Sequence, residues 1–284
     1  MRLLLEWLAR RSLRTLHALG AVLGWLGYLL SSTYRGRLRA NAERAGLTAA
    51  QRREAIAEGG RMVAEVPRLW LREPGRALAD PVRWDDEARL QSWLGHPGGL
   101  VLMTPHMGCF EVAAQWYAET VGARQPITVL YRPSNHPWLR ELEETARARP
   151  HLHTAPASLA GVRQMLRALR RGETVGLLPD QVPPDGMGEW APFFGAPAYT
   201  MTLAARLVRQ TGARLGVLWA ERLPHGGGYV VHVLEPPVPL PEPPTGDATD
   251  AAAINASMEA VIRLDPGQYL WGYHRYKGPR GGQA

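Results

Sequence analysis

Cysteine and phenylalanine are scarce in this chain of 284 residues, which contains 1 Cys and 3 Phe beside 10 Trp and 9 Tyr. The single thiol, Cys109, excludes an intramolecular disulfide framework and a cysteine-cluster metal site. Trp and Tyr combine an aromatic ring with a polar group, a usage that suits a membrane interface. Because 45% of the residues are hydrophobic and 21% are charged, the composition indicates a globular protein and argues against a disordered chain.

Acidic residues are nearly absent from the first 40 positions, where Glu6 is the only one. Seven arginines minus this one glutamate give the segment +6 of the chain's formal net charge of +7. The arginines are Arg2, Arg10, Arg11, Arg14, Arg35, Arg37 and Arg39. Nucleic-acid-binding proteins more often spread basic residues over a folded surface, so charge concentrated at one end argues against that class. It favours contact with an anionic membrane surface.

No Asp, Glu, Lys or Arg occurs among the 20 residues from Thr15 to Tyr34. This is about the length of an apolar helix that spans a bilayer. Three glycines and a histidine interrupt the run, and the basic charge is equal on its two sides, which gives little orientation bias. We therefore predict a helix that lies in the anionic leaflet rather than a committed span. The alternative is a buried core helix with arginines at its rim.

The chain is predicted to have two parts, a basic membrane anchor helix over residues 1–34 and a second domain over residues 35–284. The residues after the apolar run do not match a signal-peptide cleavage site, so we expect the anchor to be retained. The expected membrane contacts are Arg10, Arg11, Arg14, Trp25 and Arg35.

Strand-like and helix-like segments alternate through the second part of the chain. The predicted strands are 99–104, 127–131, 174–178, 215–219 and 229–234. The predicted helices are 36–72, 108–119, 136–149, 159–171, 200–210 and 248–264, and a long loop is expected at 179–197. The alternation predicts a layered α/β domain with a largely parallel central sheet flanked by helices, preceded by the membrane-associated helix.

Three polar segments follow directly on predicted strands, where α/β sheets usually place their sites. They are residues 106–111 (His-Met-Gly-Cys-Phe-Glu), 131–133 (Tyr-Arg-Pro) and 177–181 (Leu-Leu-Pro-Asp-Gln). Residues five apart do not share one face of a helix, so His106 contacts Glu111 only if it precedes the helix that carries Glu111. That arrangement is typical of a general base, because the carboxylate accepts from one imidazole nitrogen and raises the basicity of the other.

These segments resemble the lipid A biosynthesis acyltransferase family, the lauroyl and myristoyl transferases of lipopolysaccharide assembly, within the wider H-x4-D/E group of glycerolipid acyltransferases. The resemblance covers nearly the whole chain. Besides the three segments, it rests on residues 41–47, on 192–195 with the following Thr200, and on 271–277. Family members often have Asn-Trp where this chain has Cys109-Phe110, a departure that leaves His106 and Glu111 unchanged.

The resemblance implies transfer of a fatty acyl group from acyl-acyl carrier protein to a hydroxyl of a lipid A precursor, at the cytoplasmic face of the bacterial inner membrane. His106 is expected to take the acceptor proton while Glu111 stabilises the imidazolium that forms. A thioester is already activated, so we expect neither a metal nor another cofactor. Cys109 is disfavoured as a covalent nucleophile because it lies at a helix start beside the bulky Phe110.

The other candidate residues each have two interpretations. Arg132 either binds a phosphate of the lipid acceptor or of the carrier's phosphopantetheine arm, or forms an ion pair with Asp180 or a nearby acid. Asp180 and Gln181 either orient the acceptor or hold Arg132. Phe193 and Phe194 either line an acyl groove or pack in the core.

Two further alternatives stay open at this point. The three terminal basic residues, His274, Arg275 and Lys277, either contact lipid phosphates or form a solvated tail, which we favour slightly. The acceptor is either a lipid A precursor or another membrane lipid, such as a mannosylated phosphoinositide, an amino-acid lipid or a phosphoglyceride. A catalytically inert membrane scaffold is the rival of a different class, and the intact polar segments argue against it.

Overall fold

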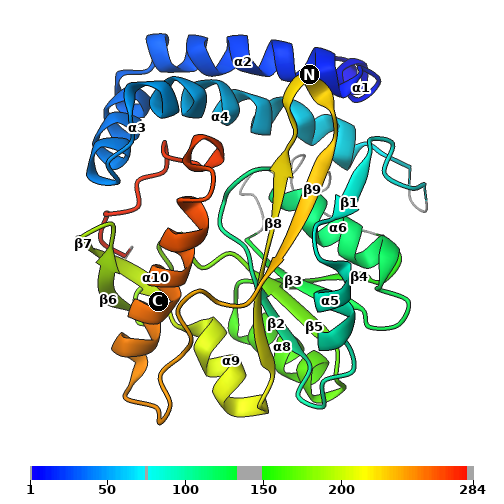
Figure 1. The fold of residues 1–284 in the computed structure, drawn as a ribbon, viewed down its shortest axis with the longest axis vertical. Helices are drawn as coiled ribbons and strands as arrows, with labels where there is room; N and C mark the ends of the chain where they lie inside the picture. Colours follow the sequence, from blue (N-terminus) through cyan, green and yellow to red (C-terminus); the bar gives the residue numbers. More distant parts are fainter. Residues whose placement is uncertain (1, 74–75, 133–148, 280–284) are drawn as a thin grey trace.

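The computed structural model describes residues 2–73, 76–132 and 149–279. At its centre is a seven-stranded sheet with the strand order β1-β9-β8-β2-β5-β3-β4 (Figure 1). Neighbouring strands are parallel except for β8 and β9, which are antiparallel. The strands are β1 (Val82–Trp84), β2 (Leu100–Met103), β3 (Ile127–Tyr131), β4 (Leu152–Pro156), β5 (Thr174–Leu177), β8 (Arg214–Arg222) and β9 (Tyr229–Leu234). The predicted α/β class with a largely parallel central sheet is confirmed.

Helices cover both faces of this sheet, which is why every residue of β2 and β5 is buried, including the polar Thr174. The helices are α5 (Glu87–Trp93) and α6 (Phe110–Thr120) on one face, and α8 (Leu159–Arg170) and α9 (Leu203–Thr211) on the other. Along β2 the side chains alternate between the two layers. Leu100 and Leu102 pack in the cluster that contains α5 and α6, and Val101 and Met103 pack in the cluster that contains α8 and α9.

The segment predicted as a long loop contains a β-hairpin, so that prediction was wrong for its second half. β6 (Gly188–Phe193) and β7 (Ala196–Met201) pair in antiparallel fashion, and α10 (Asp247–Ile262) packs against them. The two strands are joined by Phe194 and Gly195, which both have positive φ. The prolines in both strands hid this hairpin, because proline lowers strand propensity and a two-stranded hairpin tolerates it. The predicted helix 136–149 lies almost entirely outside the described residues.

Four helices form a layer over one end of the sheet (Figure 1). They are α1 (Arg2–Ala9), α2 (Leu13–Leu30), α3 (Ser32–Arg44) and α4 (Ala49–Trp70). α2 and α4 pack through glycines: a Cβ on Gly24 would lie 2.1 Å from the Ile56 carbonyl oxygen, and one on Gly60 would lie 1.9 Å from the Gly20 oxygen. The two backbones therefore approach more closely than any larger side chain allows.

The two faces of α2 differ. Its inner face is buried against the rest of the protein and includes Leu13, Leu16, Gly20, Gly24 and Tyr28. Its outer face exposes Leu19, Val22, Leu23, Trp25, Leu26, Leu29 and Leu30. Within the described part of the chain, α2 is the one helix long and apolar enough to cross a membrane, with a mean hydropathy of 1.3 over 18 residues. It thus fits a membrane-associated segment that is at the same time part of the fold.

Candidate active site

The carboxyl ends of two adjacent strands bring His106 and Asp180 together. β2 and β5 are parallel neighbours in which Met103 pairs with Leu177, so the two chains leave the sheet at the same level. The Thr104 N–H donates to the Leu177 carbonyl oxygen at 3.1 Å and extends this pairing one residue further. The topology therefore places both polar segments on the edge of the sheet where α/β proteins bind their ligands.

Asp180 holds His106 through both of its carboxylate oxygens. Nδ1 of His106 donates to Oδ1 at 2.7 Å, and the His106 backbone N–H donates to Oδ2 at 2.9 Å. The Asp180 side chain is 1% exposed, whereas that of His106 is 17% exposed. Asp180 thus accepts two hydrogen bonds from His106, and these fix the orientation of the imidazole ring relative to the strand ends.

The charge on Asp180 is stabilised despite its burial. Burial alone raises the pKa of Asp180, but the nearby imidazole, the two hydrogen bonds from His106 and the positive charge of Arg275 outweigh it and leave the pKa below its ordinary value. The hydroxyl of the buried Tyr269 also hydrogen-bonds to Asp180, and burial together with this carboxylate raises the pKa of Tyr269. Asp180 is therefore an anion, and Tyr269 a neutral donor, throughout the neutral pH range.

The other ring nitrogen of His106, Nε2, has no hydrogen-bond partner among the described residues. The edge of the imidazole ring contacts Phe110, with 5.1 Å between ring centroids. Because Nδ1 carries the proton that Asp180 accepts, the neutral imidazole has its lone pair on Nε2. This is the arrangement that a general base requires.

Glu111, which the sequence analysis placed against the imidazole, lies half-buried in the first turn of α6. It has an interaction partner of its own, but the residue that accepts the hydrogen bond from Nδ1 of His106 is Asp180. A catalytic role for Glu111 stays a prediction. The sequence placed both His106 and Asp180 just after predicted strands, but only the structure shows that these two strands are neighbours.

The segment after His106 is held by backbone hydrogen bonds to two other parts of the chain. The Leu270 N–H donates to the His106 carbonyl oxygen at 3.0 Å, and the Cys109 N–H donates to the Ala220 oxygen at 2.8 Å. Gly108 has a φ of +57° between these bonds, and a Cβ there would lie 1.9 Å from the Ala220 oxygen. Only glycine fits this turn, which sets the direction in which His106 leaves β2.

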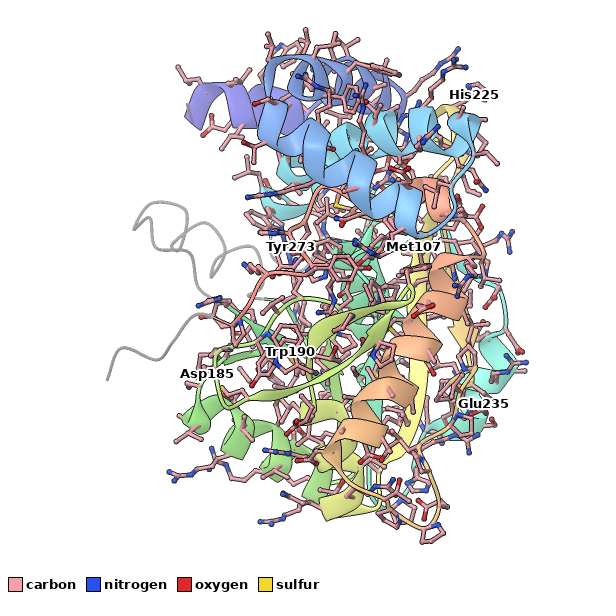
Figure 2. The ribbon with its side chains drawn as sticks, turned by 90° about the vertical axis from the view of Figure 1, so that its left-hand side faces the viewer. Met107, Asp185, Trp190, His225, Glu235 and Tyr273 are labelled. Atoms are coloured by element: carbon pink, nitrogen blue, oxygen red, sulfur yellow. The ribbon has the colours of Figure 1, made fainter. Side chains whose placement is uncertain are left out.

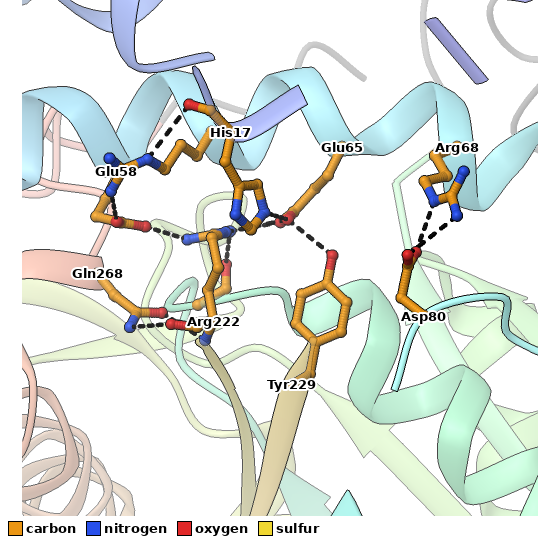
Figure 3. A network of polar contacts seen from close by, with 10 residues as sticks. His17, Glu58, Glu65, Arg68, Asp80, Arg222, Tyr229 and Gln268 are labelled. Carbon is orange, nitrogen blue, oxygen red and sulfur yellow. Dashed lines mark hydrogen bonds and ion pairs between the residues drawn. The ribbon is translucent and has the colours of Figure 1, made fainter. Parts of the chain in front are cut away.

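A buried ionic network supports the same turn from below the helical layer (Figure 3). Arg222, at the end of β8, donates to Glu58 and Glu65 of α4 and to the Gly108 carbonyl oxygen, the last at 2.9 Å. Burial raises the pKa of Glu65, but Arg222 and the hydrogen bond from His17 outweigh it and lower the pKa to about 2. The network thus links α2, α4 and the turn that carries His106.

The sequence analysis missed this network, although a signal was present. Glu58 and Glu65 are seven residues apart and therefore share one face of α4, a face whose other members are buried. Arg222 ends an apolar strand in which only one other residue of the last six is charged. Charges at such positions are buried only with partners of opposite sign.

Cys109 is buried beside Glu65, and burial together with that carboxylate raises the pKa of its thiol well above the ordinary value. Since the thiolate is the reactive form, we expect no reaction of the native protein with a disulfide reagent such as dithionitrobenzoate at pH 8, and full reaction after unfolding.

Cys109→Ala is expected to keep acyl-transfer activity within about threefold, because no covalent step passes through the thiol. Loss of turnover in a folded Cys109→Ala variant would contradict this.

The chain terminus closes over the site. Asn41 of α3 donates to the carbonyl oxygens of Trp271 and Tyr273 at 2.7 and 2.8 Å, and the Val182 N–H donates to the Tyr273 hydroxyl at 3.1 Å. Arg275 is 2% exposed and donates to the Tyr199 carbonyl oxygen at 2.7 Å. The prediction of a solvated tail was therefore wrong for Arg275, because the segment that carries it packs against β7 instead of extending into solvent.

The remaining predicted site residues lie in different surroundings. Phe193 and Phe194 are buried in the core against Tyr276 and Trp271, which agrees with the packing interpretation. Gln181 is half-buried, next to Asp180. Arg132 is exposed directly after β3, at the same edge of the sheet as His106, and the predicted ion pair with Asp180 is not formed.

The predicted membrane contacts lie in the helical layer. Arg10, Arg11 and Arg14 flank the junction of α1 and α2, and Arg11 lies over the ring of Trp7. Trp25 is exposed on α2, whereas Arg35 donates to the carbonyl oxygens of Tyr28 and Leu29 at the end of that helix. Arg35 thus serves at least partly as a helix cap.

A model of the family described as bacterial lipid A biosynthesis acyltransferase matches residues 5–278. The lipid A biosynthesis lauroyltransferase of Escherichia coli (strain K12) is 30% identical over 181 residues, which are 63% of this chain and 56% of that protein. The palmitoleoyltransferase of the same strain is 26% identical over 248 residues, 81% of this chain and 74% of that protein.

A third relative is the lipid A biosynthesis acyltransferase of Haemophilus influenzae, 26% identical over 229 residues, which are 73% of this chain and 68% of that protein. The match to the lauroyltransferase spans little more than half of that relative's length. The family match, in contrast, extends over nearly the whole chain, from α1 to the terminal segment that closes over His106. The chain belongs to the bacterial lipid A biosynthesis acyltransferase family.

Proposed function

We propose that this protein transfers a fatty acyl group from the thioester of acyl-acyl carrier protein to a hydroxyl of a lipid A precursor. The observation that carries the proposal is the pair of His106 and Asp180, with Nε2 of His106 without a partner among the described residues. The relatives support it, since their names state lauroyl and palmitoleoyl transfer in lipid A biosynthesis.

In the proposed mechanism, the acceptor hydroxyl gives its proton to Nε2 of His106 as its oxygen attacks the thioester carbonyl carbon. The imidazolium that forms is stabilised by the Asp180 carboxylate, 2.7 Å from Nδ1. The carbon–sulfur bond then breaks, and the carrier thiolate takes the proton back from His106. Glu111 in the first turn of α6 and the exposed Arg132 after β3 are further candidates, Glu111 for support of the base and Arg132 for binding a phosphate of either substrate.

We further propose that the helical layer rests on the cytoplasmic face of the bacterial inner membrane. α1 and α2 both expose large apolar side chains: Leu3, Leu4, Trp7, Leu19, Val22, Leu23, Trp25, Leu26, Leu29 and Leu30. The inner face of α2 packs along α4, so the helix fits a position in the plane of the membrane. Arginines at both ends of α2 add attraction to anionic headgroups.

The proposed function is tested with the purified full-length protein, radiolabelled acyl-acyl carrier protein and a panel of lipid acceptors. We expect acylation of a tetra-acylated lipid A precursor and no comparable product with a mannosylated phosphoinositide, an ornithine lipid or a lysophosphatidate. Thin-layer chromatography and mass spectrometry of the products measure both acceptor and chain. Preferential acylation of another acceptor would replace the lipid A assignment, and no transfer to any acceptor would support the inert scaffold instead.

A further inference from the structure

A cavity of about 250 Å³ lies between α2, α4 and the turn that joins β8 to β9. Three arginines and two histidines line it, with one glutamate: Arg14, His17, Arg61, Arg222, His225 and Glu58. Pockets for drug-sized molecules begin at roughly 300 Å³, so this cavity has the size for a smaller group such as a phosphate with part of its ester chain. The acyl-transfer mechanism proposed above does not use it.

The basic groups of this cavity are not all neutralised. Arg222 uses its donors on Glu58, Glu65 and the Gly108 carbonyl oxygen. Arg61 donates to Glu58 through Nη1 and toward the His17 carbonyl oxygen through Nε, which leaves Nη2 without a partner among the described residues.

Two further basic side chains lie at the rim of the cavity. Arg14 and His225 are exposed and make no hydrogen bond or ion pair with the described part of the chain. The lining together with Glu65 beneath it contains three guanidinium groups, two imidazoles and two carboxylates. The guanidinium groups outnumber the carboxylates, so the net charge around the cavity is positive. The paired N–H groups of a guanidinium match the oxygens of a phosphate.

The fold forms this cavity by bringing the β8–β9 turn against the first turn of α2. A Cβ on Gly226 would lie 2.4 Å from the Arg14 backbone nitrogen, so the two segments are in direct contact. His225 has a φ of +57°, and Figure 2 shows it at the end of the molecule formed by the helical layer. The first turn of α2 contains no acidic residue, so its positive dipole end is not compensated there.

The cavity also lies beside the helix that is proposed to contact the membrane. It opens beside α2, whose outer face carries the exposed apolar side chains Val22, Leu23 and Leu26. A lipid with its chains against that face would place its headgroup beside the start of α2. We propose that the cavity binds the phosphate group of an anionic membrane lipid, an inference that rests on the proposed placement of the helical layer at the membrane.

The test uses the full-length protein in a non-ionic detergent. The probes are dihexanoyl-phosphatidylglycerol below its micellar concentration, inorganic phosphate, and a phosphorylated tetra-acylated lipid A precursor as the third arm. Binding is measured by titration calorimetry and by the rise in Tm that a ligand of the folded state produces. We expect phosphatidylglycerol to bind at least tenfold more tightly than inorganic phosphate.

Four variants form two matched pairs. Arg14→Gln combined with His225→Gln removes the two basic side chains at the rim, and Ala18→Phe fills the cavity without a change of charge. Each variant is expected to weaken phosphatidylglycerol binding at least tenfold. The control variants Arg37→Gln and Ala40→Phe alter exposed positions of α3 outside the cavity. They are expected to change the affinity for phosphatidylglycerol less than twofold.

Three results would overturn the inference. If Arg37→Gln weakens phosphatidylglycerol binding as much as the Arg14→Gln, His225→Gln variant does, the effect is one of general surface charge. If inorganic phosphate binds as tightly as phosphatidylglycerol, the cavity is an anion site without preference for lipid. Variant-sensitive binding of the lipid A precursor alone would assign the cavity to the acyl acceptor. The failures are distinguishable: if the protein binds vesicles but not soluble phosphatidylglycerol, only this inference fails, whereas absence of vesicle binding removes the proposed membrane placement itself.

Discussion

His106→Ala is expected to lower the kcat for acyl transfer by about 10²–10⁴-fold, the usual contribution of a positioned general base. Asp180→Asn is expected to lower kcat at least about 10²-fold, although His106 is unchanged. An amide has no charge to stabilise the imidazolium, and its N–H group competes for Nδ1 and favours the tautomer with the proton on Nε2. Both values are measured with saturating acyl-acyl carrier protein and lipid acceptor.

Glu111→Gln is the matched control for this pair, because it makes the same change from acid to amide five residues after His106. We expect a smaller loss from Glu111→Gln than from Asp180→Asn, since Asp180 holds both Nδ1 and the backbone N–H of His106. Circular dichroism and Tm establish that each variant is folded. The reverse order, with Asp180→Asn active and Glu111→Gln inactive, would transfer the supporting role to Glu111.

The pH profile of kcat gives an independent check. The pKa of Asp180 lies below its ordinary value, because the stabilisation by His106 and Arg275 outweighs burial, so Asp180 stays ionised as the pH falls from 8 to about 5. Loss of activity over this range is therefore not expected to come from protonation of Asp180. Stability from the charged form of Asp180 is present above the ordinary carboxyl pKa of about 4 and is lost only as the pH falls through the lower folded value.

Replacement of Leu23, Leu26 and Leu30 by serine is expected to lower partitioning of the protein onto anionic vesicles by about 10³-fold or more. Each side chain lies on the outer face of α2, and Leu30 is 83% exposed. Transfer of a leucine side chain out of water contributes about 1.5–3 kcal/mol, so three of them account for roughly 4–9 kcal/mol if all insert. Vesicle co-sedimentation of wild type and variant measures the change.

Leu159→Ser and Leu264→Ser are the controls, because both leucines are exposed but lie outside the helical layer. They are expected to leave vesicle binding within about twofold. Surface substitutions are preferable to deletion of residues 1–34, since Leu13 and Leu16 are buried in the fold and their removal would expose the matching face of α4. Unchanged partitioning of the triple variant would contradict the proposed membrane face.

Much of the central domain was predictable from local patterns. The predicted ranges 127–131 and 229–234 coincide with β3 and β9, and β2 and β5 differ from prediction by a residue or two at their ends. These strands are mostly apolar because helices cover both faces of the sheet. β1, β4 and α5 were missed, because short elements at the edge of a sheet carry weak periodicity, and β4 includes His153, Thr154 and Pro156.

The sequence by itself determined the class of fold, the apolar helix with its flanking arginines, and the segments from which the site is built. Each of these depends on residues near one another in the chain, where periodicity and composition are informative. Only the tertiary structure decided that Asp180 holds His106, that Arg222 binds Glu58, Glu65 and the Gly108 oxygen, and that Arg275 is buried. These contacts join residues 74 to 164 positions apart, and strand order and helix packing, which no local pattern encodes, bring them together.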